Sequence, residues 1–156
     1  MFCCFNWVNK NADIAEQEEL YKDATWGNCP PFHPNVKYGK VIKVYDGDTI
    51  TIASKPYENH PIYRFSVRLN GIDTPEIKTK VENEKKHALI ARDALSERIL
   101  NKIVRLENVE SEKYGRLLAD VYLDNDNLNE WMIEKNYAVK YAGDTKVKPK
   151  EWFEDI

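Results

Sequence analysis

The 156-residue sequence has few cysteines and no long apolar run. Its three cysteines, Cys3, Cys4 and Cys29, all lie in the first thirty residues, so no disulfide can brace the later part of the chain. This usage is typical of a reducing compartment. No stretch is long enough to span a bilayer, and the apolar start lacks the basic residues and cleavage site of a signal peptide. The sequence therefore predicts an intracellular, cytoplasmic protein without a signal peptide or transmembrane segment.

The sequence also lacks an excess of positive charge. Its formal net charge is -3 and its pI is near 5.7, so global charge gives no argument for nucleic-acid binding. Residues 60–116 nevertheless contain 12 Lys and Arg against 9 Asp and Glu, a local net charge of +3. A basic surface confined to this stretch remains open. The contents of 42% hydrophobic and 31% charged residues are typical of a globular protein.

Residues 1–37 are predicted to be an N-terminal extension, because they contain three prolines and none of the alternation that begins at Tyr38. Residues 38–156 are predicted to form the folded domain. Asp13 and Glu16 resemble a capping box at the start of a short helix. Two roles for the extension stay open, namely packing on the folded domain through its aromatic residues and acting as a mobile arm.

Cys3 and Cys4 lie beside aromatic residues at the start of the chain. Adjacent cysteines in this setting suggest palmitoylation, which would associate the N-terminus with a membrane. Two free thiols in an ordinary terminus are the simpler interpretation. Both interpretations stay open at the level of the sequence.

Apolar periodicity predicts five short strands with a long helix between the third and the fourth. The strands are expected at residues 41–45, 49–52, 63–69, 103–106 and 117–123, and the helix at about 84–100. A second helix is expected after Asn127, a good N-cap, with Asn136 as a left-handed stop. This order predicts an α+β fold, mainly a five-stranded antiparallel barrel of the oligonucleotide-binding (OB) type with helices packed on it.

Several acids and arginines lie in short motifs among these predicted strands and helices. These residue types are suited to cutting a phosphodiester with a hard metal ion. They lie in Asp46-Gly47-Asp48-Thr49, at Arg68, in Asp73-Thr74-Pro75-Glu76 and in Lys113-Tyr114-Gly115-Arg116. Taken singly, each motif also has a structural interpretation as a hairpin turn, a capped loop or an ordinary ion pair. Their occurrence together at predicted strand ends favours a common site.

The residue types predict a role for each group. Asp48 and Asp73 can hold Ca²⁺ through oxygen, and Pro75 helps to turn the carbonyl of Thr74 toward the same ion. Glu76 can act as general base on a water molecule. Arg68 and Arg116 can contact phosphate oxygens in a bidentate manner and stabilise the transition state. Zinc is not expected, because the three histidines lack ligand spacing.

On these motifs the chain resembles the staphylococcal nuclease (thermonuclease) family from roughly Tyr38 to Tyr141. The resemblance implies an OB-fold barrel, a calcium cofactor with no organic cofactor, and hydrolysis of single-stranded DNA and RNA that leaves 3′-phosphates. It also implies substrate contacts by Tyr114, Tyr141 and Lys113. A monomer is expected.

One departure from the family concerns the C-terminus, where Pro149 predicts a shortened third helix. A second interpretation, from a different functional class, is a catalytically silent domain of the same fold that binds nucleic acid or a protein partner. Silent domains usually lose the acids or the arginines, whereas this chain keeps all of them, so activity is favoured.

Overall fold

The computed structural model describes residues 10–112, 115–143 and 148–154. The predictions for Cys3, Cys4, Lys113 and Tyr114 lie outside these residues. The chain divides into two compact units, Met1–Phe32 and His33–Ile156. The role predicted for residues 1–37 stays a prediction.

The first unit contains one helix, α1 (Lys10–Tyr21). Asp13 lies inside its first turn, so the prediction that Asp13 starts the helix was wrong. The helix already includes the three residues before Asp13. A carboxylate in the first turn still interacts favourably with the positive end of the helix dipole.

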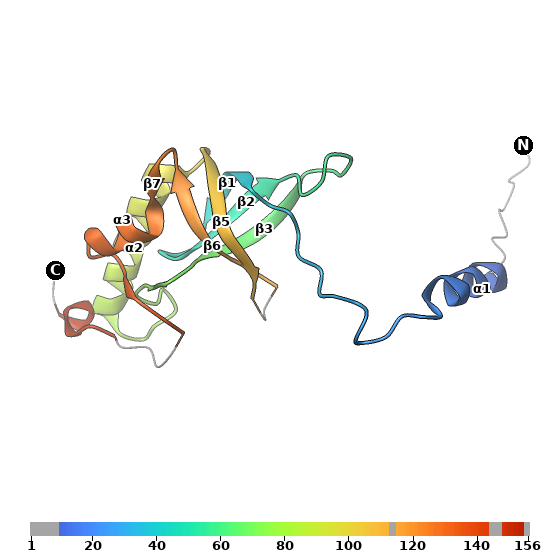
Figure 1. Ribbon diagram of the computed structural model, residues 1–156. Helices are drawn as coiled ribbons and strands as arrows, with labels where there is room; N and C mark the ends of the chain where they lie inside the picture. The colour runs from blue at the N-terminus through green and yellow to red at the C-terminus, as the bar shows by residue number, and fades with distance from the viewer. Residues whose placement is uncertain (1–9, 113–114, 144–147, 155–156) are drawn as a thin grey trace, which may run out of the picture. The chain divides into compact units, whose positions relative to one another are not determined.

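The second unit is built on a closed five-stranded barrel, which confirms the expected fold (Figure 1). Its strands are β1 (Tyr38–Val44), β2 (Thr49–Ser54), β3 (Tyr63–Leu69), β5 (Ile103–Ser111) and β6 (Leu117–Leu123). They are ordered β3-β2-β1-β5-β6, and the neighbours in this order pair antiparallel. The closing pair differs, because β3 and β6 run parallel there.

The barrel interior is filled by alternate residues of the strands, as the period of two requires. Ile50 and Ile52 of β2 and Val67 and Leu69 of β3 have no exposed surface. Arg68 lies between two of these buried residues, so its side chain is directed to the other face of β3. The alternation thus fixes the direction of the first functional arginine.

Two helices flank the barrel on one side (Figure 1). In α2 (Glu82–Ile99) the buried residues recur at helical spacing and comprise Glu84, Ala88, Ala91, Leu95 and Ile99. The second helix, α3 (Leu128–Glu134), follows the short strand β7 (Asp126–Asn127). The Asn127 side chain accepts hydrogen bonds from the first turn of α3, and Asn136 has a φ of 58°, so both predictions for this helix are confirmed.

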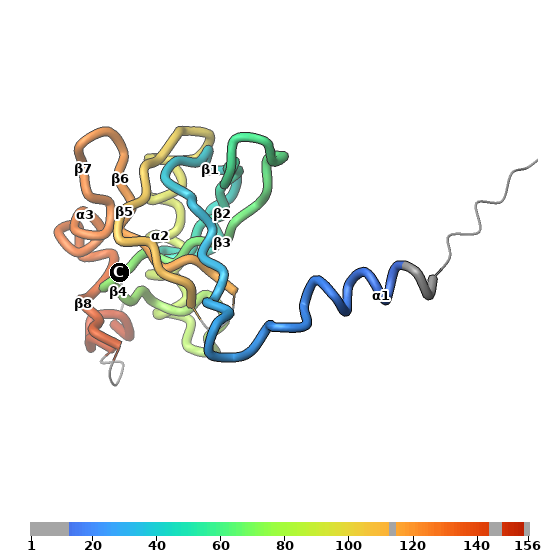
Figure 2. Tube along the Cα trace, turned by 45° about the vertical axis from the view of Figure 1, so that its right-hand side comes forward, coloured from blue at the N-terminus to red at the C-terminus, as the bar shows by residue number. Residues whose placement is uncertain are grey.

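The C-terminal segment returns to the barrel in short elements. Strand β8 (Val139–Lys140) pairs antiparallel with β4 (Ile72–Asp73), close to α3 (Figure 2). Within residues 148–154, the described part of the C-terminus, Pro149 is followed by a 3₁₀ turn, η1 (Lys150–Phe153), instead of an α-helix, which agrees with a shortened third helix. Trp152 of η1 is buried and η1 packs against α2.

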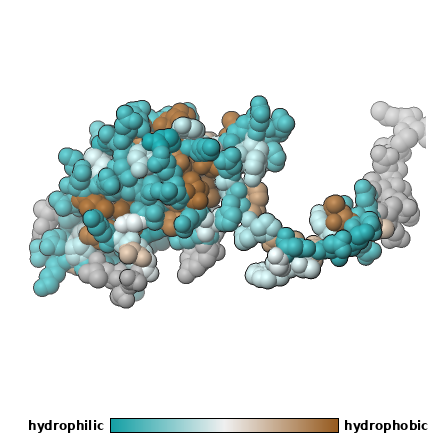
Figure 3. Space-filling view, viewed as in Figure 1, coloured by the Kyte–Doolittle hydropathy of each residue, from teal (hydrophilic) through white to brown (hydrophobic). Residues whose placement is uncertain are grey.

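On the face of the second unit that Figure 3 shows, most of the coloured surface is hydrophilic, and the hydrophobic side chains form separate patches. Within the described parts of the chain, no helix combines the length and the apolar character needed to cross a membrane.

Candidate active site

The turn between β1 and β2 brings Asp48 into the protein. The Asp46 carboxylate accepts a hydrogen bond from the Asp48 N–H at 3.1 Å, and the Tyr45 N–H donates to the Thr49 carbonyl at 2.9 Å. A Cβ at Gly47 would lie only 2.9 Å from Cγ2 of Thr74, so the absence of a side chain at position 47 lets the two loops approach. Asp48 is consequently 4% exposed, although it lies in a turn.

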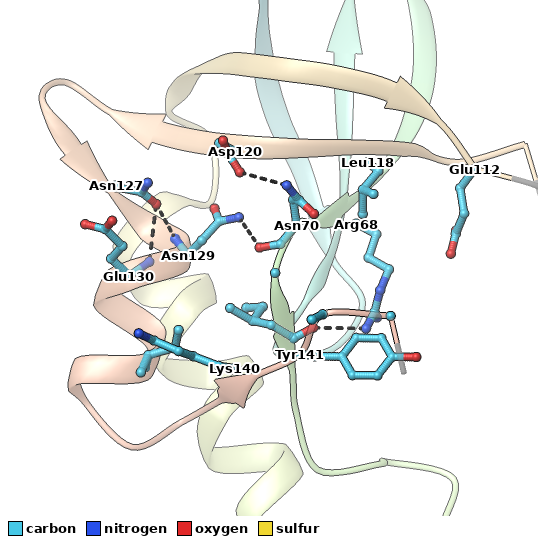
Figure 4. Close-up of a pocket in the computed structure, with 15 residues that line it drawn as sticks. Arg68, Asn70, Glu112, Leu118, Asp120, Asn127, Asn129, Glu130, Lys140 and Tyr141 are labelled. Carbon is cyan, nitrogen blue, oxygen red and sulfur yellow. Dashed lines mark hydrogen bonds between the residues drawn. The ribbon is translucent and has the colours of Figure 1, made fainter. Parts of the chain in front are cut away.

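Arg68 joins the two predicted calcium ligands. Its guanidinium donates to Oδ2 of Asp48 at 2.5 Å and lies 3.4 Å from Oδ1 of Asp73. It also donates to the Ile72 carbonyl at 3.1 Å (Figure 4). The arginine and both carboxylates are buried, with 13%, 5% and 3% of their side chains exposed. Residues from three separate motifs therefore form one charged cluster.

Burial and charge set the acidity of this cluster. Burial, with the charge of Asp46, raises the pKa of Asp48 to about 7, while Arg68 opposes the rise by favouring the carboxylate. Burial by itself would lower the pKa of Arg68, but the carboxylates of Asp48 and Asp73 outweigh this effect and raise it. The guanidinium is thus the positive charge that neutralises the two buried acids.

The donor atoms of the cluster fit a hard cation. Asp48, Asp73 and Thr74 are all buried, and they offer carboxylate and carbonyl oxygens, which Ca²⁺ prefers. In the described part of the chain no three histidine, cysteine or acidic side chains gather into a single cluster. A cation held by these two carboxylates and one carbonyl would complete its coordination with water molecules.

Glu76 lies on the loop between β4 and α2, and its side chain is exposed to solvent. Its backbone N–H lies 3.4 Å from a carboxylate oxygen of Glu84, in the first turn of α2. The same carboxylate accepts from the Thr79 hydroxyl at 2.6 Å and from the Lys148 ammonium at 2.5 Å. Glu84 thus holds both ends of the Glu76–Thr79 segment and connects it to the C-terminal segment.

The second predicted arginine is placed differently. Nε of Arg116 donates to Glu112 at 2.6 Å across the turn between β5 and β6. Glu112 lines the same pocket as Arg68, and its charge contributes to the raised pKa of Arg68. An acid of the chain, Glu112, therefore lies near both of the arginines that are expected to contact phosphate.

A pocket of about 780 Å³ opens beside Arg68 (Figure 4). Tyr141, which follows β8, is one of the residues that line this pocket. The Tyr141 ring lies next to the Arg68 side chain in Figure 4. The Tyr141 N–H donates to the Gly71 carbonyl at 2.9 Å, which fixes this segment at the end of β3. The structure therefore brings Tyr141 and Arg68 together at one pocket.

Three residues of the site were missed by the sequence analysis. No role was predicted for Glu112 or Glu84, although Glu84 falls four residues before Ala88 on the apolar side of α2. Asn129 is also buried; its amide donates to the Asn70 carbonyl at 2.7 Å, and its oxygen accepts from the Val121 N–H. This asparagine connects α3 to the strands that line the pocket, and its position after a helix cap gave no signal of that role.

The sequence profile described as staphylococcal nuclease homologue matches residues 66–154, which is more than half of the chain. The chain belongs to the staphylococcal nuclease family. The matched region includes Arg68, Asp73, Glu76 and Arg116.

Curated relatives of the family agree with this match. The chain is 33% identical over 101 residues to a thermonuclease of Staphylococcus hyicus, covering 64% of this chain and 56% of the relative. It is 33% identical over 102 residues to an uncharacterized endonuclease of Haemophilus influenzae, covering 65% and 51%. It is 30% identical over 135 residues to an uncharacterized protein of Methanocaldococcus jannaschii, covering 71% and 62%. The chain thus spans between half and two thirds of the length of these relatives.

Proposed function

We propose that the chain is a calcium-dependent, largely sequence-nonspecific nuclease that hydrolyses phosphodiester bonds of single-stranded DNA and RNA and leaves 3′-phosphates. The observation that carries the proposal is the buried cluster in which Arg68 contacts both Asp48 and Asp73 at the edge of the Tyr141 pocket. The names of relatives from S. hyicus and H. influenzae, a thermonuclease and an endonuclease, support the same activity.

Asp48, Asp73 and the carbonyl of Thr74 are the groups that would hold calcium, since Arg68 brings the two carboxylates together and Thr74 is the buried residue that follows Asp73. A bound divalent cation supplies a Lewis acid that polarises the phosphate. Arg68 would contact a phosphate oxygen with its guanidinium, and Arg116 would do the same once phosphate replaces Glu112 beside it. The two guanidiniums stabilise the negative charge that gathers on the phosphate oxygens in the transition state.

Glu76 is the proposed general base, because its carboxylate is exposed to solvent while its backbone is held by Glu84. Glu76 takes a proton from a water molecule as the water oxygen bonds to phosphorus. The bond from phosphorus to the 5′ oxygen breaks, and this oxygen takes a proton from solvent water and leaves as a hydroxyl. The phosphate stays on the 3′ oxygen. Tyr141, together with Tyr114 and Lys113, is proposed to contact the nucleotide beside the cut.

Cleavage of a fluorescent single-stranded oligonucleotide in calcium, in magnesium and in EDTA tests this function. We expect cutting in calcium, slower cutting in magnesium because of its stricter octahedral geometry, and none in EDTA. Treatment with a phosphatase that removes 3′-phosphates should change the gel mobility of the products, which would identify 3′-phosphate ends. Equal rates in calcium and EDTA would contradict the role of the acids. A well-folded protein that binds the strand without cutting it would instead be the silent binding domain.

A further inference from the structure

An exposed tyrosine lies between two lysines beside the proposed site, outside the Tyr141 pocket. Tyr45 is 44% exposed, and the ammonium groups of Lys43 and Lys78 lie 5.7 and 5.9 Å from the centre of its ring. A hydrogen bond between Lys78 and Tyr45 raises the pKa of Lys78. Among the described residues neither lysine forms an ion pair with an acid. Two positive charges therefore stay available around one aromatic ring.

The three residues join the two loops that carry the predicted calcium ligands. Tyr45 immediately precedes the turn that contains Asp48, and Lys78 follows Glu76 by two residues. These loops are fixed against each other by the close approach at Gly47. Lys43, Tyr45 and Lys78 are all exposed, and none of them lines the Tyr141 pocket.

Single-stranded nucleic acid alternates flat bases with phosphate anions. An exposed aromatic ring can stack on a base of any identity, and lysines beside it can contact the flanking phosphates. A pair of lysines near a tyrosine also occurs on ordinary protein surfaces. At this position, however, the ring and the lysines adjoin the loops that carry Asp48 and Glu76, so a strand cut at these residues would lie near Tyr45. The charge and the ring are complementary to that strand.

We propose that Lys43, Tyr45 and Lys78 form an outer subsite that binds a nucleotide of single-stranded DNA or RNA next to the phosphate being cut. The base stacks on Tyr45 and its flanking phosphates contact the two lysines. This subsite rests on the proposed nuclease function. It explains sequence-nonspecific binding, because stacking and phosphate contacts do not read the base edges.

The ring is tested by Tyr45→Ala, with Tyr63→Ala as the matched control, since Tyr63 is 45% exposed on the same barrel. Both changes are made in protein that carries Glu76→Gln, so that the probe is not cut. Anisotropy of a labelled eight-nucleotide strand in calcium measures affinity. We expect Tyr45→Ala to weaken binding about tenfold, the lower range of one base–aromatic stack, and Tyr63→Ala to change it less than twofold.

A nucleoside 3′,5′-bisphosphate serves as the short probe, because it carries a single base and Tyr45 is not among the residues that line the pocket. Its affinity should be unchanged by Tyr45→Ala. The double variant Lys43→Ala/Lys78→Ala should reduce the slope of log affinity against log salt for the strand by about 1.4, the value for two phosphate contacts on a single strand. Lys40→Ala, an exposed lysine on the same strand β1, is its control.

The subsite would be overturned if Tyr45→Ala and Tyr63→Ala reduced the affinity for the strand equally. It would also be overturned if Tyr45→Ala reduced the affinity for the short probe as much as that for the strand, or if the unmodified protein did not bind the strand. The outcomes separate the two proposals. Cutting by unmodified protein with no effect of Tyr45→Ala would reject the subsite and keep the nuclease. Tyr45-dependent binding without cutting would keep the subsite and reject the nuclease.

Discussion

Replacement of Arg68 with lysine is expected to slow cleavage at saturating substrate by at least about 100-fold, the effect of removing one well-placed donor to a transition-state anion. The guanidinium contacts Asp48, Asp73 and the Ile72 carbonyl at the same time. A lysine carries a single ammonium group and cannot make this planar set of contacts. The rate of single-turnover cleavage in calcium measures the loss, and Arg64→Lys is the control, because Arg64 is an exposed arginine of the same strand.

The same residue gives a second observable, the stability of the folded protein. Arg68→Met leaves two buried carboxylates without their positive partner, which is expected to lower the free energy of unfolding by about 3–5 kcal/mol in EDTA. Calcium should restore part of this loss, since it would bind the same acids. Denaturant unfolding in EDTA and in calcium measures both values. For the cleavage prediction, an Arg68→Lys protein that cuts the strand at a rate within tenfold of the unmodified protein would contradict the catalytic role assigned to Arg68.

Glu84→Ala is expected to reduce both stability and activity, although Glu84 does not contact the proposed substrate. The change removes the acceptor for the Thr79 hydroxyl, the Lys148 ammonium and the Glu76 N–H. Loss of a buried acceptor for several donors is expected to cost about 2–3 kcal/mol of unfolding free energy. Since the segment that carries Glu76 loses its anchor, kcat should fall while KM for the strand changes little.

Glu82→Ala is the control for this prediction, because Glu82 is an exposed acid of the same first turn of α2. Burial by itself would raise the pKa of Glu84, but its hydrogen bonds from Lys148, Thr79 and Glu76 outweigh burial and lower it. Its contribution to stability is therefore present above its ordinary pKa of 4.5 and lost as the pH falls through the lowered value. A Glu84 variant as active and as stable as the Glu82 variant would show that the anchor is unnecessary.

Much of the fold follows from local patterns in the sequence. Strand β3 and strand β6 were predicted with the bounds that the structure shows, because apolar and polar residues alternate in β3 and β6 is a short, mainly apolar run. Asn127 and Asn136 marked the ends of α3 through a side-chain cap and a left-handed backbone. Strand β5 extends further than its apolar residues indicated, to Ser111, because β6 continues to pair with it beyond an irregularity near Asn108.

The candidate site was predictable where chemistry and strand ends coincide, and less so where pairing depends on tertiary contacts. Asp48, Arg68 and Asp73 were expected together and lie together. The contact of Arg116 with Glu112 was not foreseen, because both residues flank a turn and the sequence alone does not say which partner the arginine takes. The burial of Glu84 depends on Lys148, which is 64 residues away in the chain.

The most direct test of the account is the single-turnover rate of cutting a fluorescent single strand in calcium by the unmodified protein and by Glu76→Gln. Strand binding is measured in parallel. Glutamine keeps the shape of the side chain but cannot accept the proton, so the rate should fall by about 100-fold or more while affinity changes less than twofold. Cutting at the unmodified rate by Glu76→Gln, or no cutting by the folded unmodified protein, would contradict the account.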